Sequence, residues 1–156
     1  MRVFVVMGLV LVALVGCAAS GPQPRLPVTP LSILTARGPV HFRVELASNS
    51  SEHATGLMFR TVMAPDAGML FDFHRPTSVA FWMKNTILPL DMIFIRMDGT
   101  VSTIHARAVP ESETPIYSAE PIRAVLEINA GRAEALGIEP GDRVEHAIFP
   151  ASPGPH

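Results

Sequence analysis

The sequence from about 40 to 149 is a succession of short apolar runs separated by turn residues. In the first run, residues 40–46, apolar and polar side chains alternate, which is the period-two pattern of a half-buried strand. Asp98-Gly99 separates two later runs and predicts a hairpin, because both residues readily adopt positive φ in a tight turn. In all, about seven short strands are predicted, at 40–46, 68–73, 79–84, 91–96, 101–105, 122–128 and 142–148.

Two short helices are predicted among these strands. Ser50 or Ser51 can cap a helix that runs to about Arg60. Asn129 is expected to cap a second helix, which Gly137 can end because glycine adopts the left-handed conformation at little cost. The predicted fold class is therefore α+β, mostly β: a small closed or nearly closed β-barrel-like sheet with two short helices.

The first sixteen residues have the character of a signal peptide. Arg2 precedes an apolar run, 3–15, that is too short to cross a bilayer as a mature helix. Leu14-Val15-Gly16-Cys17 resembles a bacterial lipobox, in which the cysteine becomes the lipidated first residue after cleavage. An ordinary secretory signal or an uncleaved anchor would also explain the apolar run. We therefore expect a signal peptide over 1–16 and lipidation at Cys17.

Cys17 is the only cysteine in the 156-residue chain, so the folded part cannot form an internal disulfide and must be stabilised by burial. Residues 17–39 hold this cysteine and a proline-rich stretch, which we expect to be an extended tether. Residues 150–156 have the composition of a disordered tail. One domain, over 40–149, is left between them, and its length suits a single core.

The charge balance argues against some classes of partner. The chain has 12 Lys and Arg against 14 Asp and Glu, and loss of the signal peptide removes Arg2, so the mature net charge is about −3. The absence of a basic block argues against binding of nucleic acid and against electrostatic binding to membranes. Membrane attachment would come from acyl chains on Cys17. Ala18 after Cys17 favours the outer membrane if the cell has two membranes, with the domain facing the periplasm.

Five motifs occur in order along the domain and together resemble the DUF192 family: Gly56-Leu57-Met58-Phe59-Arg60, Gly68-Met69-Leu70-Phe71, Phe81-Trp82-Met83-Lys84-Asn85-Thr86, Pro89-Leu90-Asp91 and Gly137-Ile138-Glu139-Pro140-Gly141-Asp142. This family comprises small, often exported or membrane-attached domains of bacteria and archaea, and the resemblance covers about 40–149. It implies a compact, mostly-β α+β domain and leaves the activity open. Some relatives carry cysteines in the segment that matches 109–117, where this chain has Glu111, Glu113 and Thr114. The resemblance therefore does not imply a thiol-based role here.

The only lysine and the only tryptophan, Lys84 and Trp82, stand two residues apart, and every other basic residue is arginine. On a strand, the two side chains project to the same side. Lys84 could bind a carboxylate or phosphate of a ligand, or act as a base or amine nucleophile if it is desolvated. It could also be structural, either paired with Asp91 or packed on Trp82. Trp82 could stack on a flat ligand or cover the core.

Three further residues complete the predicted ligand site. Arg60 could offer a guanidinium fork to a carboxylate, or stabilise the end of the first helix. Asn85 could hydrogen-bond a ligand or stabilise a turn. Asp91 could orient Lys84 or Arg60. The ligand-binding residues predicted from the sequence are therefore Arg60, Trp82, Lys84, Asn85 and Asp91.

No motif points to a metal, a cofactor or a set of catalytic residues, and none of the three is expected. Methionines and histidines are numerous enough to suit copper, but the histidines lack ligand spacing and most of the methionines lie in apolar runs. The leading hypothesis is a lipid-anchored cell-envelope protein that binds a small polar or anionic ligand, or a segment of a partner protein, near Trp82 and Lys84. The alternatives are an envelope enzyme that uses Lys84 as base or nucleophile, and a structural lipoprotein that docks to other envelope proteins.

Overall fold

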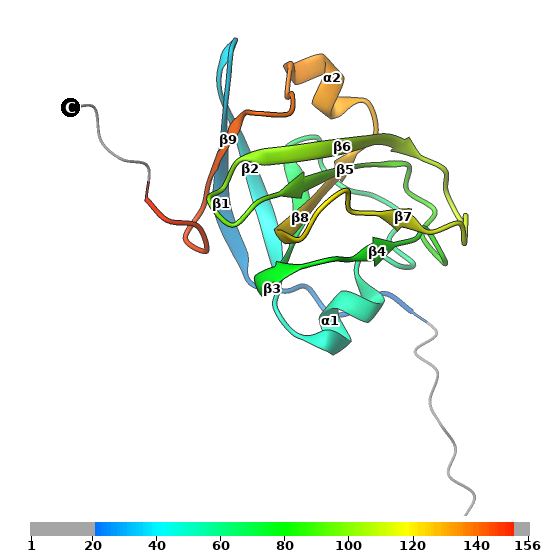
Figure 1. Cartoon of the computed structure of the whole chain (residues 1–156). Helices are drawn as coiled ribbons and strands as arrows, with labels where there is room; N and C mark the ends of the chain where they lie inside the picture. Colours follow the sequence, from blue (N-terminus) through cyan, green and yellow to red (C-terminus); the bar gives the residue numbers. More distant parts are fainter. Residues whose placement is uncertain (1–20, 152–156) are drawn as a thin grey trace, which may run out of the picture.

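The computed structural model describes residues 21–151, in which one curled seven-stranded sheet forms the body of the molecule (Figure 1). The predicted signal peptide, 1–16, and the predicted lipidation site, Cys17, lie outside the described residues. Strands β4 and β7 form a separate two-stranded ribbon. The elements in chain order are β1 (Val28–Thr35), β2 (Gly38–Ala47), α1 (Ser50–Thr55), β3 (Ala67–Thr77), β4 (Ala80–Phe81), β5 (Leu90–Ile95), β6 (Val101–Ala108), β7 (Ile116–Tyr117), β8 (Ile122–Asn129), α2 (Arg132–Leu136) and β9 (Arg143–Glu145).

The seven strands are ordered β6-β5-β8-β3-β2-β1-β9, and each neighbouring pair is antiparallel except β2 and β3, which are parallel. The sheet curls until its edge strands β6 and β9 approach each other at one end (Figure 1). Thr100 and Arg143 form a β-bridge there, and the backbone N–H of Val101 donates to the carbonyl of Asp142 at 2.8 Å. The predicted fold class is confirmed: the domain is mostly β, with a nearly closed sheet and two short helices.

The inside of the curl holds the main hydrophobic core. On β8, Ala124, Leu126 and Ile128 face this core, because side chains alternate along a strand. They pack with buried apolar residues from the other strands and from the C-terminal segment: Leu31, Ile33, Phe42, Val44, Leu70, Ile93, Ile95, Val101, Val144 and Phe149.

A second apolar cluster lies on the opposite face of the central strands. Met69 of β3, Met92 of β5 and Val125 of β8 belong to it. Leu57, after α1, and Met83, after β4, cover these strands from outside the sheet. Strand β8 is therefore buried on both faces, so a polar side chain on either face of its middle is removed from water.

The prediction of an extended tether over 17–39 is wrong from Val28 onward, because this part of the chain forms β1 and enters β2. Strand β1 pairs with β2 throughout and with β9 only over 32–34, and its alternate apolar side chains enter the core. Pro30 lies where β2 is the only strand beside β1 among the described residues. A proline at such an edge costs little, because its missing N–H has no ladder partner to lose.

Helix α1 is present but shorter than predicted. It ends at Thr55 instead of Arg60, because Gly56 leaves the helical conformation with φ 48° and ψ −131°. Its cap is Asn49, whose side chain accepts hydrogen bonds from two backbone N–H groups of the first turn. The prediction that a serine caps this helix is therefore wrong by one residue.

Helix α2 begins differently from the prediction and ends as predicted. Gly131 occupies the N-cap position with no side-chain hydrogen bond, so Asn129 is not the cap. The side-chain amide of Asn129 donates instead to the carbonyls of Met63 and Ala64, both at 3.1 Å. Gly137 ends the helix in the left-handed conformation with φ 68°, which confirms that prediction.

Candidate functional site

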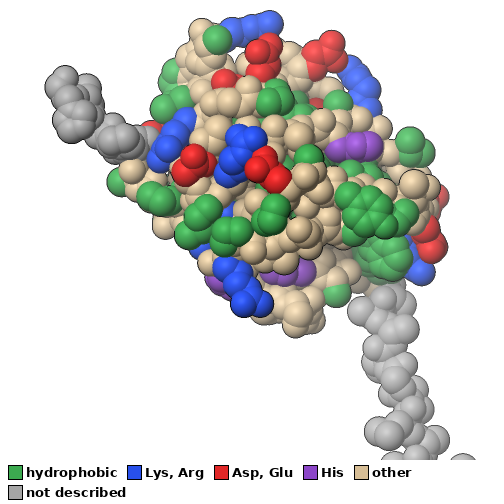
Figure 2. Space-filling view, in the orientation of Figure 1, with side chains coloured by type: hydrophobic (Ala, Val, Ile, Leu, Met, Phe, Trp, Pro, Cys, Tyr) green, Lys and Arg blue, Asp and Glu red, His purple; other side chains and the backbone are tan. Residues whose placement is uncertain are grey.

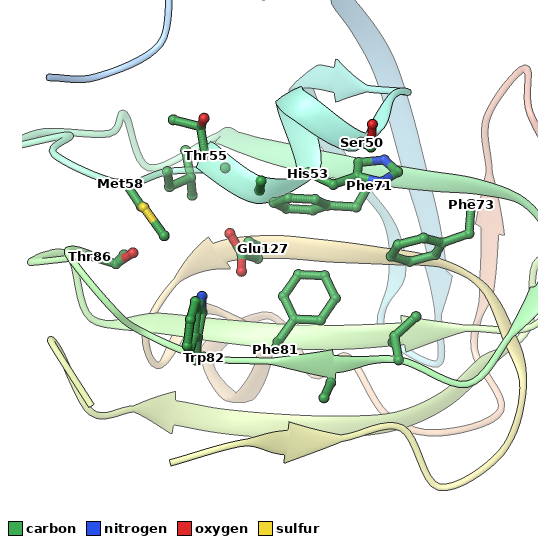
Figure 3. A pocket seen from close by; sticks show the side chains of 15 residues that line it. Ser50, His53, Thr55, Met58, Phe71, Phe73, Phe81, Trp82, Thr86 and Glu127 are labelled. Carbon is green, nitrogen blue, oxygen red and sulfur yellow. The ribbon is translucent and has the colours of Figure 1, made fainter. Parts of the chain in front are cut away.

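A pocket of about 500 Å³ opens between α1 and β4, on the face of the sheet opposite to the main core (Figure 3). Its walls come from α1 and the turn after it, from β3 and from the chain around β4, and β8 supplies part of its floor. A cavity of this volume suits a small organic molecule. The residues that line it are Ser50, His53, Ala54, Thr55, Gly56, Leu57, Met58, Phe71, Phe73, Val79, Ala80, Phe81, Trp82, Thr86 and Glu127.

The carboxyl group of Glu127 lies at the floor of this pocket (Figure 3). Glu127 is directly opposite Met69 of β3 and Met92 of β5 in two antiparallel ladders, so the three side chains share the outer face of the sheet. The residue is 4% exposed and makes no hydrogen bond or ion pair with any described side chain. Burial raises the pKa of the Glu127 carboxyl group from 4.5 to about 8, because a low-dielectric site disfavours the charged form.

Aromatic rings form the walls around this carboxyl group. The ring of Phe81 meets that of Phe71 edge to face, with centroids 5.1 Å apart, and that of Phe73 at 6.3 Å. The imidazole of His53 on α1 lies 5.0 Å from the ring of Phe73. Such edge contacts between rings are favourable, so they hold the walls in a defined arrangement.

Several polar groups at the pocket are held as hydrogen-bond acceptors. His53 Nε2 lies 3.0 Å from the carbonyl oxygen of Ala47, so a neutral His53 donates there and leaves Nδ1 as an acceptor. The hydroxyls of Thr55 and Thr86 donate to backbone carbonyls of their own turns, both at 3.2 Å, which leaves their lone pairs free. The indole N–H of Trp82 is a donor at the same site.

The predicted proximity of Trp82 and Lys84 is confirmed, although β4 covers only Ala80–Phe81 of the strand predicted over 79–84. Lys84 Nζ lies 5.2 Å from the centre of the indole ring, which is the distance of a cation–π contact. Trp82 is 47% exposed and lines the pocket, whereas Lys84 does not line it. The alternative of an ion pair between Lys84 and Asp91 is wrong, because Lys84 Nζ pairs with Glu113 at 3.5 Å.

Arg60 is occupied by a carboxylate of the protein itself. Its two terminal nitrogens donate to the two oxygens of Glu45 at 3.2 and 3.0 Å, and Arg60 is 9% exposed. The carbonyl oxygen of Gln23 accepts a longer bond from the same guanidinium at 3.4 Å. Arg60 does not line the pocket. Its guanidinium group instead links the turn after α1 to strand β2 and to the chain before β1.

Asn85 and Asp91 also have structural partners. Asn85 adopts φ 54°, and its carbonyl accepts the backbone N–H of Phe59 at 2.8 Å, so it stabilises a turn. Asp91 is completely buried, and its two oxygens accept the backbone N–H groups of Arg107 at 2.8 Å and Ala133 at 2.9 Å. Asp91 therefore orients neither Lys84 nor Arg60. Of the five residues predicted for the site, only Trp82 lines the pocket, with Lys84 beside it.

Glu127 is the residue that sequence reasoning missed. It lies inside the apolar run 122–128, which was correctly predicted as a strand. An acidic residue in the middle of such a run is a usable signal, because a strand buried on both faces is otherwise apolar. The same signal does not reveal that an aromatic pocket lies above the carboxyl group.

The pocket has two titratable side chains, His53 and Glu127. Within residues 21–151, no three or more His, Cys, Asp or Glu side chains are grouped so that they could hold a metal ion. Over the same residues, neither helix has the length and apolar character needed to cross a membrane.

The chain is similar to known proteins over most of its folded part. The sequence pattern of the DUF192 family, described as Uncharacterized ACR, matches residues 32–146. A crystal structure of a candidate transcription regulator from Sinorhizobium meliloti 1021 is 50% identical, with a TM-score of 0.79, and the match covers 81% of this chain and 99% of that one. A protein of unknown function from Novosphingobium aromaticivorans DSM 12444 is 47% identical, with a TM-score of 0.77 and coverage of 83% and 94%. No curated protein matches the chain.

Proposed function

This chain belongs to the DUF192 family, and we propose that it is a lipid-anchored cell-envelope protein that binds a small molecule in the pocket between α1 and β4. The observation that carries the proposal is the Glu127 carboxyl group, which is buried, has no partner among the described residues and lies on the pocket floor. Burial of an unpartnered carboxyl group costs stability. A ligand that pairs with it would offset this cost, so the arrangement supports a binding role.

The pocket also supports ligand binding over the docking alternative. A structural docking protein would present an exposed apolar face without a hollow, whereas Trp82 borders a cavity of about 500 Å³. The rings of Phe71 and Phe81 give this cavity apolar walls that suit the flat body of an organic molecule.

The sequence predicted a small polar or anionic ligand. We keep a polar ligand in the proposal, but an anionic one is disfavoured inside the pocket. Within residues 21–151, no lysine or arginine lines the pocket, and the Glu127 carboxyl group repels an anion at the floor once it ionises, as it does above its pKa of about 8. Lys84 is the nearby cation, but it is paired with Glu113 and does not line the pocket. An anionic group would therefore meet Lys84 only at the rim.

The single tryptophan provides a direct test. Trp82 fluorescence and thermal unfolding of the full-length chain would be followed against a library of small polar aromatic compounds, because a ligand of the native state stabilises it by mass action. Ala54→Phe should block the pocket, since Ala54 is an exposed residue of α1 that lines it. Ala135→Phe, on the exposed side of α2, is the matched control. The proposal predicts hits that Ala54→Phe abolishes and Ala135→Phe keeps, and a library without such hits would refute it.

The name of the S. meliloti relative suggests transcription regulation, but the charges of this chain oppose it. Many arginines are already paired with carboxylates, including those of Glu45, Asp72, Glu120 and Glu134. Figure 2 shows basic and acidic side chains interspersed on one face of the molecule. Binding of nucleic acid needs clustered cations. We expect no retardation of duplex DNA in a low-salt gel shift, and a salt-sensitive shift would instead favour a regulatory role.

The proposed attachment to the envelope depends on Cys17. Because Cys17 is the only cysteine, any acyl group on a cysteine of this chain reports that position. Wild type expressed with an alkyne-labelled fatty acid should become labelled and sediment with membranes. Cys17→Ser should lose both the label and the sedimentation. Unlabelled wild type, or a Cys17→Ser chain that still sediments, would refute the lipid anchor.

A second candidate function is proton-transfer catalysis by Glu127. The observation that favours it is the position of the Glu127 carboxyl group at the pocket floor, where burial raises its pKa to about 8, near the pH at which a general acid or base is most effective. In this candidate function the acid or base is Glu127 and not Lys84, because Lys84 pairs with Glu113 and does not line the pocket. This function would be favoured if wild type converts a bound compound and Glu127→Gln still binds that compound but no longer converts it.

A further inference from the structure

We infer that the ligand of this pocket carries a positive charge on an apolar body, as a protonated or quaternary amine does, and that the Glu127 carboxylate binds this charge. The inference rests on the proposed function, since it names the class of molecule that the same pocket takes. Three observations carry it: the pairing of the other buried carboxylates, the aromatic walls, and the acceptor groups at the pocket.

The first observation is that the other buried carboxylates are paired from within the chain. Glu45 and Asp72 each accept two hydrogen bonds from the guanidinium group of an arginine, and Asp91 accepts two backbone N–H groups. All three are less than a tenth exposed, as Glu127 is. Glu127 alone among these four has no such donor within the described residues. A cation from outside would fill the place that an internal donor takes at the other three.

The second observation is the set of rings around the carboxyl group. Figure 3 shows Glu127 between Phe71 on one side and Phe81 and Trp82 on the other. The faces of aromatic rings attract cations, and cages of such rings bind quaternary ammonium groups. The indole of Trp82 already makes one contact of this kind, with Lys84 Nζ at 5.2 Å from its centre.

The third observation is the character of the remaining polar groups. His53 donates from Nε2 to the carbonyl of Ala47, so its neutral form has Nδ1 as an acceptor. Thr55 and Thr86 have free hydroxyl lone pairs, because their protons are donated to backbone carbonyls. An ammonium group has only donors to offer, so these three acceptors complement it. The indole N–H of Trp82 is a donor at the same site, and Trp82 can contribute to cation binding only through the face of its ring. Lys84 lies beside Trp82 but does not line the pocket, and its pairing with Glu113 at 3.5 Å reduces its repulsion of a second cation.

The test uses three probes of one shape that differ in charge: benzylamine, benzyl alcohol and phenylacetate. Their affinities for the full-length chain would be measured by Trp82 fluorescence at pH 7 and at pH 8.5, where benzylamine is mainly a cation. Wild type should bind benzylamine more tightly than benzyl alcohol by roughly tenfold or more at pH 8.5, which is the range of a charge-assisted hydrogen bond in a buried site. The preference should be smaller at pH 7, because most of the Glu127 carboxyl groups must first lose a proton there. Glu127→Gln should lose this preference and keep its affinity for benzyl alcohol, because the amide has the same shape without the charge.

A second readout separates charge pairing from general packing. Burial keeps the Glu127 carboxyl group largely protonated at pH 7, so a cation that binds its charged form must displace a proton. Calorimetric titrations of benzylamine in two buffers with different enthalpies of ionisation would detect this release. We expect proton release for wild type and none for Glu127→Gln. Should that variant fail to fold, the order of the three probes and the proton release of wild type still decide the question.

The possible results separate this inference from the proposed function. Equal affinities for benzylamine and benzyl alcohol at pH 8.5 would overturn the cation inference and leave the pocket as a small-molecule site. A preference for phenylacetate would overturn it in favour of an anionic ligand. If none of the three probes binds wild type at millimolar concentration, the small-molecule pocket itself is refuted, and the inference falls with it.

Discussion

Glu127 of β8 lies directly opposite Met69 of β3, so an ionisable carboxyl group and a thioether share one buried face of the sheet. On the same face, Met92 of β5 flanks Glu127 from the other side. The carboxyl group thus sits between two sulfur-bearing side chains that offer it no strong hydrogen bond. Its protonation is therefore coupled to folding, and this coupling can be measured.

Glu127→Gln should remove a pH dependence from the free energy of unfolding. The pKa of the Glu127 carboxyl group is about 8 in the folded state against an ordinary value of 4.5, so between these two pH values the folded state holds a proton that the unfolded state has released. The stabilisation that protonated Glu127 gives to the folded state is therefore complete below pH 4.5. It is lost as the pH rises to 8, by up to about 1.4 kcal/mol per pH unit. Urea unfolding of both proteins from pH 5 to 9 checks this.

Glu134→Gln is the control for that series. Glu134 is exposed and pairs with Arg107 at 2.8 Å, so its substitution should leave the pH profile close to that of wild type. The difference in unfolding free energy between wild type and Glu127→Gln should change steadily with pH and level off above about pH 8. Parallel pH profiles for wild type and Glu127→Gln would show that burial does not perturb the pKa of the Glu127 carboxyl group.

Arg60→Met should destabilise the domain by about 3 kcal/mol, because it leaves the buried Glu45 carboxylate without its two-point partner. Arg25→Met is the matched control, since Arg25 contacts the same carboxylate at 3.1 Å with a side chain that is 72% exposed. An exposed ion pair contributes about 1 kcal/mol or less, so this variant should be nearly as stable as wild type. Equal losses in the two variants, measured by urea unfolding, would contradict the structural role given to Arg60.

Local parts of the fold could be predicted from the sequence because their signals are local. The alternation over 40–46 and the Asp98-Gly99 turn both depend on neighbouring residues, and both features are present as β2 and as the β5–β6 hairpin. Strand β1 could not be predicted, because Pro30 within it and Pro27 just before it suit a tether, and its pairing with β2 and β9 is visible only in three dimensions. The curl that brings β6 to β9 is likewise a property of the whole sheet.

The candidate site also has one part that could be predicted from the sequence and another that could not. The proximity of Trp82 and Lys84 could be predicted because they stand two residues apart, although the contact forms in the turn after β4 and not on the strand that was predicted. The position of Glu127 depends on which side of β8 faces the pocket, and that is decided by α1 and β4, which are distant in the sequence. Asp91 was assigned to the site because its partner at Ala133, 42 residues away, cannot be recognised from sequence.

Asp91→Asn should cost about 2 kcal/mol or more of unfolding free energy. An asparagine has one acceptor oxygen, so its amide would place N–H donors against the backbone N–H of Arg107 or of Ala133 in a fully buried site. Asp98→Asn is the control, because Asp98 accepts one N–H in an exposed turn, where asparagine is equally suitable. A stable Asp91→Asn protein with altered ligand binding would instead return Asp91 to the ligand site.

Lys84→Met should alter Trp82 fluorescence and change stability by less than about 1 kcal/mol, because the Lys84 and Glu113 side chains are 41% and 62% exposed and their ion pair is in contact with water. Lys84→Arg keeps a cation beside the indole and serves as the control, so its emission should stay closer to that of wild type. Benzylamine affinity should change far less in Lys84→Met than in Glu127→Gln, because Lys84 does not line the pocket. If Lys84→Met lost binding and Glu127→Gln kept it, the centre of the site would move from the pocket floor to the rim, where the sequence first placed it.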